Sequence, residues 1–207
     1  NKKPIAMVSI CSGGGLATIF KELGVDTVIQ GGQTMNPSVN DILNVIENVN
    51  SDNVIVLPNN KNIILAAEQA VELSSKNVKV VQTVNVPEGI ACAVAFDINR
   101  DIDANVEAMQ EAYSEVSYGE VTYAVRKTNL DGFDLQEGDI IGITDKKIVS
   151  KGADVSDVTF DVIGNLVDED KSVITLYYGE GVTEEQANSL KETLADKYDE
   201  CDVEVYE

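Results

Sequence analysis

The sequence contains no histidine among its 207 residues. Histidine is the commonest general base, the usual partner of a serine or cysteine nucleophile, and a frequent metal ligand. Its absence therefore argues against a catalytic triad and against the usual zinc sites. The three cysteines, Cys11, Cys92 and Cys201, are scattered and never spaced as Cys-x-x-Cys. We expect buried thiols rather than a disulfide framework or a metal site.

Long apolar runs are also missing. No run approaches the roughly 18 to 20 apolar residues that a membrane-spanning helix needs. The first residues, NKKPIAMVSI, lack the apolar core and the cleavage site of a signal peptide. These absences predict a cytoplasmic protein with no direct membrane insertion. The chain begins without Met and almost at once with a strand pattern, which suggests a domain taken from a longer protein.

Positive charge is scarce, and the shortage is concentrated in the second half of the chain. Residues 1–100 hold 7 basic and 9 acidic residues, net −2, whereas residues 101–207 hold 8 and 27, net −19. Such charge repels nucleic acids and anionic membrane surfaces, so neither is an expected partner. A basic protein surface is the natural complement. The alternative is a solvated acidic surface that only aids solubility.

The first half of the chain alternates strand and helix patterns. Four short β-branched runs have the continuous apolar character of parallel strands buried on both faces: 4–10, 26–29, 53–58 and 78–82. Helical periodicities lie between and after them, at 39–49, 60–74 and 102–116. Strand then helix, repeated, predicts a parallel sheet with right-handed crossovers.

The pattern changes near residue 117. An alternating run at 119–128 and two short strands at 138–150 predict hairpins. A helix, a strand, a helix opened by a capping box at 183–186, and a closing strand follow. We therefore predict an α/β fold with two subdomains. These are a parallel βα-repeat sheet at 1–117 and a smaller, acidic, mixed α/β lobe at 118–207.

The stretch GGQTMNPS, which starts at Gly31, directly follows the second predicted strand. We predict Asn36 as the N-cap of the next helix and Pro37 as its first residue. A helix N-terminus presents free N–H groups, where a phosphate or carboxylate can bind. The alternative is an ordinary tight turn between a strand and a helix.

Two more loops should lie beside it, because the carboxyl ends of parallel strands share one edge of the sheet. CSGGG at 11–15 lacks the Lys-Ser/Thr of a P-loop and the last glycine of a dinucleotide-binding motif, so it indicates a turn at a helix start. Asn59-Asn60-Lys61 follows the third strand. The candidate ligand-loop residues are Gly13, Gly14, Gly31, Gly32, Gln33, Thr34, Asn36, Ser38, Asn59 and Asn60.

The acidic clusters match no metal-binding motif. DINRDID at 97–103 begins like a calcium-binding EF-hand loop, but Ile102 stands where that loop needs glycine and Ala108 where it needs glutamate. A helix N-terminal acid explains this cluster better. We predict no catalytic residue and no metal ligand. The candidate partner-binding residues are the acids around the capping box: Glu180, Glu184 and Glu185.

A family resemblance rests on GGQTMNPSVNDIL, VIVLPNNKNIILAAEQA and TVNVPEGIACAVAFD, followed by an amphipathic helix and VTYAVRKT. The chain resembles, over essentially its whole length, the C-terminal region of the ATP-binding subunit of bacterial fatty acid kinase, a dihydroxyacetone-kinase-like protein. The nucleotide-binding segment of that family, with its Asp-rich magnesium loop, has no counterpart here. The resemblance implies that this chain binds no cofactor and that ATP and magnesium belong to the full-length subunit.

The predicted layout also resembles the two-lobed, DegV-type fold of the fatty-acid-binding partner proteins. Those proteins hold a fatty acid carboxylate with a Thr-Ser-Gln-Pro-Ser loop. Here Pro37 and Ser38 are kept, but Gly31 and Gly32 stand in place of the Thr-Ser pair before Gln33. The resemblance implies a loop with the geometry of an acid-binding turn but without the hydroxyl groups that would hold the acid.

These patterns leave three hypotheses. The leading one is a non-catalytic docking domain that binds a fatty-acid-binding partner with a basic surface, so that the bound fatty acid can be phosphorylated for phospholipid synthesis. The alternative is a fatty acid or small-anion binding domain that uses the three loops. The third is an enzyme in its own right, which would require the isolated chain to bind ATP.

Overall fold

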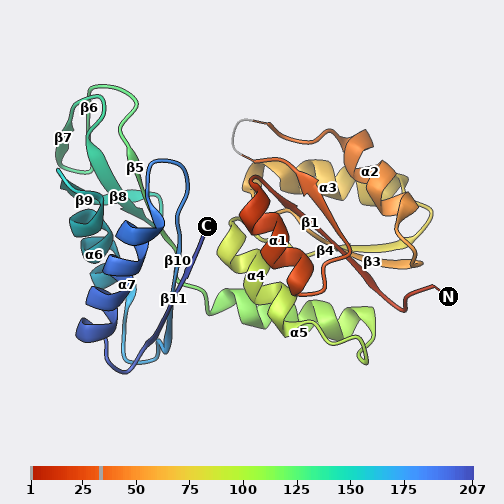
Figure 1. Cartoon of the computed structure of the whole chain (residues 1–207). Helices are drawn as coiled ribbons and strands as arrows, with labels where there is room; N and C mark the ends of the chain where they lie inside the picture. The colour runs from red at the N-terminus through yellow and green to blue at the C-terminus, as the bar shows by residue number, and fades with distance from the viewer. Residues whose placement is uncertain (1, 33–34) are drawn as a thin grey trace. The chain divides into compact units, whose positions relative to one another are not determined.

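The chain forms two compact units, Asn1–Val116 and Ser117–Glu207 (Figure 1). The computed structural model describes residues 2–32 and 35–207. The protein is of the α/β class. A parallel sheet in unit 1 is followed by antiparallel strands, a parallel strand pair and two helices in unit 2.

Unit 1 is built on a four-stranded parallel sheet in the order β2-β1-β3-β4. Its strands are β1 (Ala6–Cys11), β2 (Thr27–Gln30), β3 (Asn53–Leu57) and β4 (Asn77–Val80). All six residues of β1 are buried. A central strand of a parallel sheet is covered on both faces, which is why the sequence of β1 is apolar at nearly every position.

Helices cover both faces of this sheet (Figure 1). They are α1 (Gly14–Glu22), α2 (Val39–Asn48), α3 (Lys61–Leu73), α4 (Val86–Ala95) and α5 (Ile102–Ser114). Ile55 and Leu57 of β3 pack with α1, α4 and α5, whereas Val54 and Val56 pack with α2 and α3. Successive side chains of a strand point to opposite faces, so two separate apolar clusters hold the helices onto the sheet.

The predicted start of α2 is wrong. Its N-cap is Ser38, not Asn36, and Pro37 precedes the cap. Ser38 Oγ accepts a hydrogen bond from the Asp41 N–H at 3.1 Å, and the Asp41 carboxylate accepts one from the Ser38 N–H at 2.9 Å. This reciprocal pair needs an acid three residues after the cap. Ser38 has Asp41 there, whereas Asn36 has Val39.

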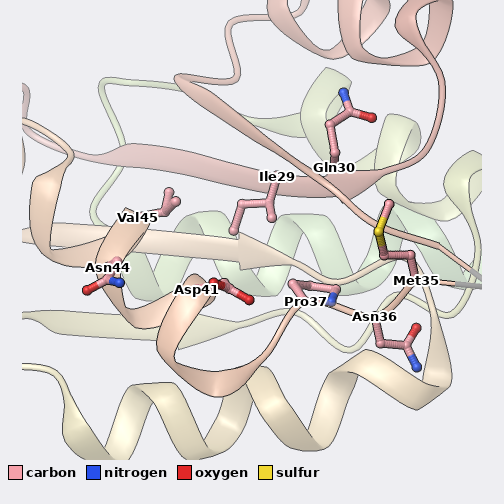
Figure 2. A pocket seen from close by; sticks show the side chains of 8 residues that line it. All are labelled: Ile29, Gln30, Met35, Asn36, Pro37, Asp41, Asn44 and Val45. Atoms are coloured by element: carbon pink, nitrogen blue, oxygen red, sulfur yellow. The ribbon is translucent and has the colours of Figure 1, made fainter.

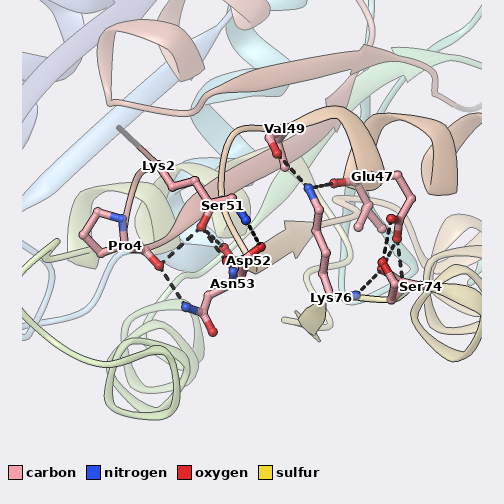
Figure 3. Close-up of polar contacts among 11 residues, drawn as sticks. Lys2, Pro4, Glu47, Val49, Ser51, Asp52, Asn53, Ser74 and Lys76 are labelled. Carbon is pink, nitrogen blue, oxygen red and sulfur yellow. Dashed lines mark hydrogen bonds and ion pairs between the residues drawn. The ribbon is translucent and has the colours of Figure 1, made fainter.

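Polar side chains close the amino ends of the strands in unit 1 (Figure 3). Asn53 Nδ2 donates to the Pro4 carbonyl at 2.9 Å. Lys76 Nζ donates to the carbonyls of Ile46 and Val49, at 2.8 and 2.7 Å, at the end of α2. A cation at this position pairs with carbonyls that the helix leaves free and complements the helix dipole. The candidate loops lie at the opposite edge, at the carboxyl ends of the strands.

Unit 2 contains an antiparallel sheet in the order β5-β8-β9, a β6-β7 hairpin and a parallel β10-β11 pair. Its elements are β5 (Gly119–Tyr123), β6 (Thr128–Leu130), β7 (Phe133–Leu135), β8 (Ile140–Thr144), β9 (Lys147–Gly152), α6 (Val155–Leu166), β10 (Val173–Tyr177), α7 (Glu184–Lys197) and β11 (Asp202–Tyr206). A Cβ atom on Gly142 would lie 2.3 Å from Val162 Cγ2, so glycine is needed where α6 crosses the sheet. Leu194 of α7 packs against β10 and β11.

The single strand predicted at 119–128 is two strands. The Ala124 N–H donates to the Asp139 carbonyl at 2.8 Å, and the Gly138 N–H donates to the Ala124 carbonyl at 2.7 Å. Beyond these bonds the chain bends at Val125 and Arg126 before β6 begins. A turn at 130–132 joins β6 to β7, because Asp131 and Gly132 adopt the positive φ angles, 52° and 84°, that a tight hairpin needs.

Candidate functional site

The N-terminus of α1 lies at the carboxyl end of β1 and is open. Gly13 is the N-cap, with φ of 96°, and Gly14 is the first helical residue. No side chain caps this helix, and its first turn has no acidic residue. A Cβ atom built on either glycine would meet nothing within 4 Å. The open helix start is the feature of this loop that could attract an anion, although a helix N-terminus alone does not make a site.

The loop after β2 lies against the loop after β1. The Gly31 N–H donates to the Cys11 carbonyl at 3.0 Å, and Gly32 and Met35 form a short antiparallel bridge. A Cβ atom on Gly32 would lie 2.9 Å from Ser12 Oγ, and one on Gly31 would lie 2.7 Å from Pro37 Cδ. Both glycines are therefore explained by close packing, Gly32 against the loop after β1 and Gly31 within its own loop. The candidates Gln33 and Thr34 lie outside the described residues.

The hydroxyl group of Ser38 is engaged in the cap of α2. It donates to Asp41 Oδ2 at 2.7 Å and accepts from the Asp41 N–H. Hydrogen bonds from the side chain and then the backbone of Ser38 hold the pKa of the Asp41 carboxyl below its ordinary value. A ligand carboxylate at this serine would have to displace the Asp41 carboxylate.

Asn59 is buried at the end of β3, where its side chain contacts β1, the segment after β4, and α4. Its Nδ2 donates to Ser9 Oγ and to the Ile10 carbonyl, both at 2.9 Å. Its Oδ1 accepts from Thr83 Oγ1 at 2.8 Å, and its N–H donates to the same hydroxyl group at 3.0 Å. A Cβ atom on Gly89 of α4 would lie 2.0 Å from Asn59 Oδ1. The side chain is thus fully used inside the protein, at a φ of 56° that asparagine tolerates better than most residues.

The neighbouring residue, Asn60, has a different structural role from Asn59. Asn60 is the N-cap of α3, and its Oδ1 accepts from the Asn62 N–H at 2.9 Å. Sequence reasoning identified both asparagines but missed the partners of Asn59, which are Ser9, Thr83 and Gly89. A polar serine in the middle of an otherwise apolar strand was the available signal for the first of these.

A pocket of about 400 Å³ lies between the edge strand β2 and helix α2 (Figure 2). A smaller one of about 240 Å³ continues along the same two elements. The lining of the larger pocket comprises Ile29, Gln30, Met35, Asn36, Pro37, Asp41, Asn44 and Val45. Among the described lining residues, Asn36 is the one predicted ligand-loop residue. The pocket therefore flanks the predicted loop site rather than coinciding with it.

The carboxylates predicted to bind a partner are exposed. Glu180 precedes α7, and Glu184 and Glu185 form its first turn after the capping box of Thr183 and Gln186, which the structure confirms. Residues 153–207 hold 3 basic and 16 acidic residues, net −13. Residues 117–152 hold 5 and 6, net −1. The acidity of unit 2 is therefore concentrated in its last two helices and last two strands.

Comparison with protein families shows which family the chain belongs to. A family model described as the FakA-like C-terminal domain of fatty acid kinase matches residues 6–207. The chain belongs to this family. It is 38% identical over 205 residues to protein YloV of Bacillus subtilis, and 33% identical over 202 residues to an uncharacterized protein of Staphylococcus aureus strain USA300. These matches cover 99% and 98% of the chain but only 37% of the length of each relative.

A solved structure shares the fold. It is the Fak B3 protein of the fatty acid kinase of Streptococcus pneumoniae, loaded with linoleic acid, and it aligns with a TM-score of 0.62 at 9% sequence identity. The alignment covers 98% of this chain and 92% of that protein. The likeness confirms the predicted DegV-like fold. At 9% sequence identity, the structural likeness shows only that the two proteins share a fold.

Two further findings concern metal binding and membrane-spanning helices. Among the residues that the structure describes, no three acidic or cysteine side chains are grouped so as to hold a metal ion. In the same part of the chain, no helix combines the length and apolar character needed to cross a bilayer.

Proposed function

We propose that the chain is a non-catalytic docking domain of a fatty acid kinase subunit. It binds the fatty-acid-binding partner protein so that the bound fatty acid can be phosphorylated for phospholipid synthesis. In this proposal ATP and magnesium are held by the remainder of the longer cytoplasmic protein. The observation that carries the proposal is the net charge of −13 on residues 153–207, which gives a basic partner surface a defined place to dock.

The family and the fold support this proposal from two sides. The family links the chain to fatty acid kinase, and the fold likeness links it to a protein that is itself loaded with a fatty acid. Unit 1 has the DegV-type architecture, but its candidate loop residues Ser38 and Asn59 are engaged in hydrogen bonds of the protein itself. A domain with this fold, whose described loop residues Ser38 and Asn59 are already engaged, fits docking better than carrying.

Charge reversal tests the docking surface. The variant E180K/E184K/E185K should lower the affinity for a fatty-acid-binding protein of the Fak B3 kind, loaded with linoleic acid, by about tenfold or more. The matched control is E22K/E72K/E111K, which makes the same change in net charge at exposed positions of unit 1. Isothermal titration calorimetry at low salt compares the two. Equal losses would mean that net charge, rather than this turn, governs docking.

The alternative function, a fatty acid or small-anion binding domain, is favoured by one observation. The uncapped start of α1 lies in the loop that contacts Gly32 of the neighbouring loop. Native mass spectrometry of the purified chain distinguishes the two functions. Docking predicts no retained acyl chain. A retained fatty acid that is lost in the Ser38→Ala variant would favour the alternative.

A further inference from the structure

One face of the parallel strand pair in unit 2 is open to solvent. Ile174 of β10 and Val203 of β11 pack with Leu194 of α7 on the other face. Successive residues of a strand point to opposite faces, so the residues on either side of Ile174 and Val203 point away from α7. We call this side the β10–β11 outer face, and its residues are Val173, Thr175, Tyr177, Asp202, Glu204 and Tyr206. Val173 is 53% exposed and Tyr206 37% exposed, so this face is a surface rather than part of the core.

Two tyrosines form the aromatic part of the outer face. The rings of Tyr177 and Tyr206 stack with their centroids 5.8 Å apart and their planes at 22°. The Tyr206 hydroxyl group donates to Glu204 Oε2 at 3.3 Å. Burial, and then the neighbouring Tyr206 and Glu204, raise the pKa of the Tyr177 hydroxyl to about 12. The two rings and the Glu204 carboxylate therefore form one contiguous group.

The acids of the outer face have no cation of their own. Among the described residues, neither Asp202 nor Glu204 takes part in an ion pair. Their direct neighbours on β10 are Val173 and Thr175, which carry no charge. A carboxylate beside two stacked aromatic rings, in a stretch of net charge −13, is complementary to a cation.

The outer face adjoins the acids already proposed for docking. The Tyr178 N–H, one residue beyond β10, donates to the Tyr206 carbonyl at 2.9 Å. Burial raises the pKa of the Tyr178 hydroxyl, and the carboxylates of Glu207 and Glu184 raise it further. Both carboxylates therefore act on the residue that follows Tyr177. The stacked tyrosines and the capping-box turn belong to the same end of unit 2.

We propose that the β10–β11 outer face receives an arginine side chain of the basic partner. This inference rests on the proposed docking function and names the chemistry of its contact. The guanidinium group stacks on the ring of Tyr206 and pairs with the Glu204 carboxylate. Arginine fits better than lysine, because its planar guanidinium group can stack on a ring and can bind a carboxylate through two N–H groups at once. Tyrosine and arginine are also enriched among the residues that dominate the binding energy of interfaces.

Two matched pairs of variants test the contact. Tyr206→Leu removes the aromatic ring and should lower the affinity for a linoleic-acid-loaded protein of the Fak B3 kind by about fivefold, whereas Tyr206→Phe keeps the ring and should bind within about twofold of the wild type. Glu204→Gln removes only the charge and should also cost about fivefold. Its control is Glu192→Gln, at an exposed acid of α7, which should bind within about twofold of the wild type. Isothermal titration calorimetry at low salt compares the four variants.

A second measurement tests the preference for arginine without the partner protein. A hexa-arginine peptide should bind the wild-type chain about threefold more tightly than a hexa-lysine peptide of the same charge. Tyr206→Leu should remove this preference and leave the affinity for the lysine peptide within about twofold of the wild type. Fluorescence anisotropy of labelled peptides measures both affinities, and circular dichroism melts confirm that each variant is folded.

The proposal is overturned if the loaded protein binds the folded Tyr206→Leu and Glu204→Gln variants as tightly as the wild type. Weakened binding of E180K/E184K/E185K would then leave the docking function standing without this contact. Equal binding of the two peptides by the wild type would also overturn the proposal. So would self-association of the wild type that Tyr206→Leu abolishes in sedimentation velocity, because a second copy of the chain would then occupy the face. A wild-type chain that does not bind the loaded protein would overturn the docking function and this contact together.

Discussion

The loop edge of unit 1 and the acidic end of unit 2 use their polar residues in opposite ways. At the loop edge, Ser38 and Asn59 are engaged by neighbouring groups of the protein, and Asn59 is only 7% exposed. At the acidic end, Glu180, Glu184 and Glu185 face solvent. The sequence presents both sets as candidate binding residues. The structure separates residues that hold the fold together from residues that remain available to a partner.

The two regions should also differ in how much a substitution changes the free energy of unfolding. A buried polar group that loses its partner costs about 1–3 kcal/mol, whereas surface substitutions away from such features usually stay within about 0.5 kcal/mol. Mutations at the loop edge should therefore change stability first and binding second. Mutations at the acidic end should do the reverse. Each prediction below tests one side of this contrast.

The largest expected effect is at Asn59. Asn59→Ala removes the donor to Ser9 Oγ and the acceptor of the Thr83 hydroxyl group and places alanine at a positive φ, so it should destabilise unit 1 by about 2–4 kcal/mol. The matched control is Asn60→Ala, which removes only an exposed helix cap and should cost about 1 kcal/mol. Urea unfolding measures both. Equal losses would show that the buried network adds nothing beyond a cap.

A smaller effect is expected at Ser38. Ser38→Ala removes the cap of α2 and should cost about 1 kcal/mol at neutral pH. The folded-state pKa of Asp41 is depressed, so its share of the cap is present above its ordinary pKa of 3.8 and is lost as pH falls through the folded value. The gap between the unfolding midpoints of wild type and variant should therefore narrow as the pH falls below 3.8 and through the folded-state pKa of Asp41. A constant gap would contradict the coupling of Ser38 to the Asp41 carboxylate.

The smallest stability effect is expected at the acidic end. Glu184→Lys and Glu185→Lys replace acids that favour the dipole of α7, so each should cost about 0.3–1 kcal/mol. Glu180→Lys lies before the helix and serves as the control, with a loss near zero. Thermal melts by circular dichroism compare the three. A loss of several kcal/mol would mean that these carboxylates are structural, which would remove the contrast with unit 1.

The sequence predicts the elements better than it predicts the use of individual polar residues. Apolar periodicity places every strand of the parallel sheet within a few residues, because the central strands β1 and β3 are buried and the edge strands β2 and β4 are partly buried. The capping box at Thr183 is visible because its residues are three apart in sequence. The change of pattern near residue 117 was a further signal, and the structure divides the chain between Val116 and Ser117.

The failures have physical reasons. Whether Asn59 faces a ligand or the core depends on Ser9 and Thr83, which are 50 and 24 residues away, so local sequence cannot show it. The Asn-Pro dipeptide predicted Asn36 as the N-cap of α2. The cap is Ser38 instead, because Ser38 forms reciprocal hydrogen bonds with Asp41. The break in the strand at 119–128 depended on backbone bonds between Ala124 and the distant segment of Asp139.

The docking role is tested most directly by the salt dependence of the association rate. Biolayer interferometry would measure this rate between the wild-type chain and a loaded fatty-acid-binding protein of the Fak B3 kind, from low to physiological salt. Charge steering by residues 153–207 predicts that the association rate falls steeply with salt while the dissociation rate changes little, and that E180K/E184K/E185K flattens this dependence. An association rate that does not depend on salt, or the same dependence in the folded triple variant, would contradict docking through the acidic end.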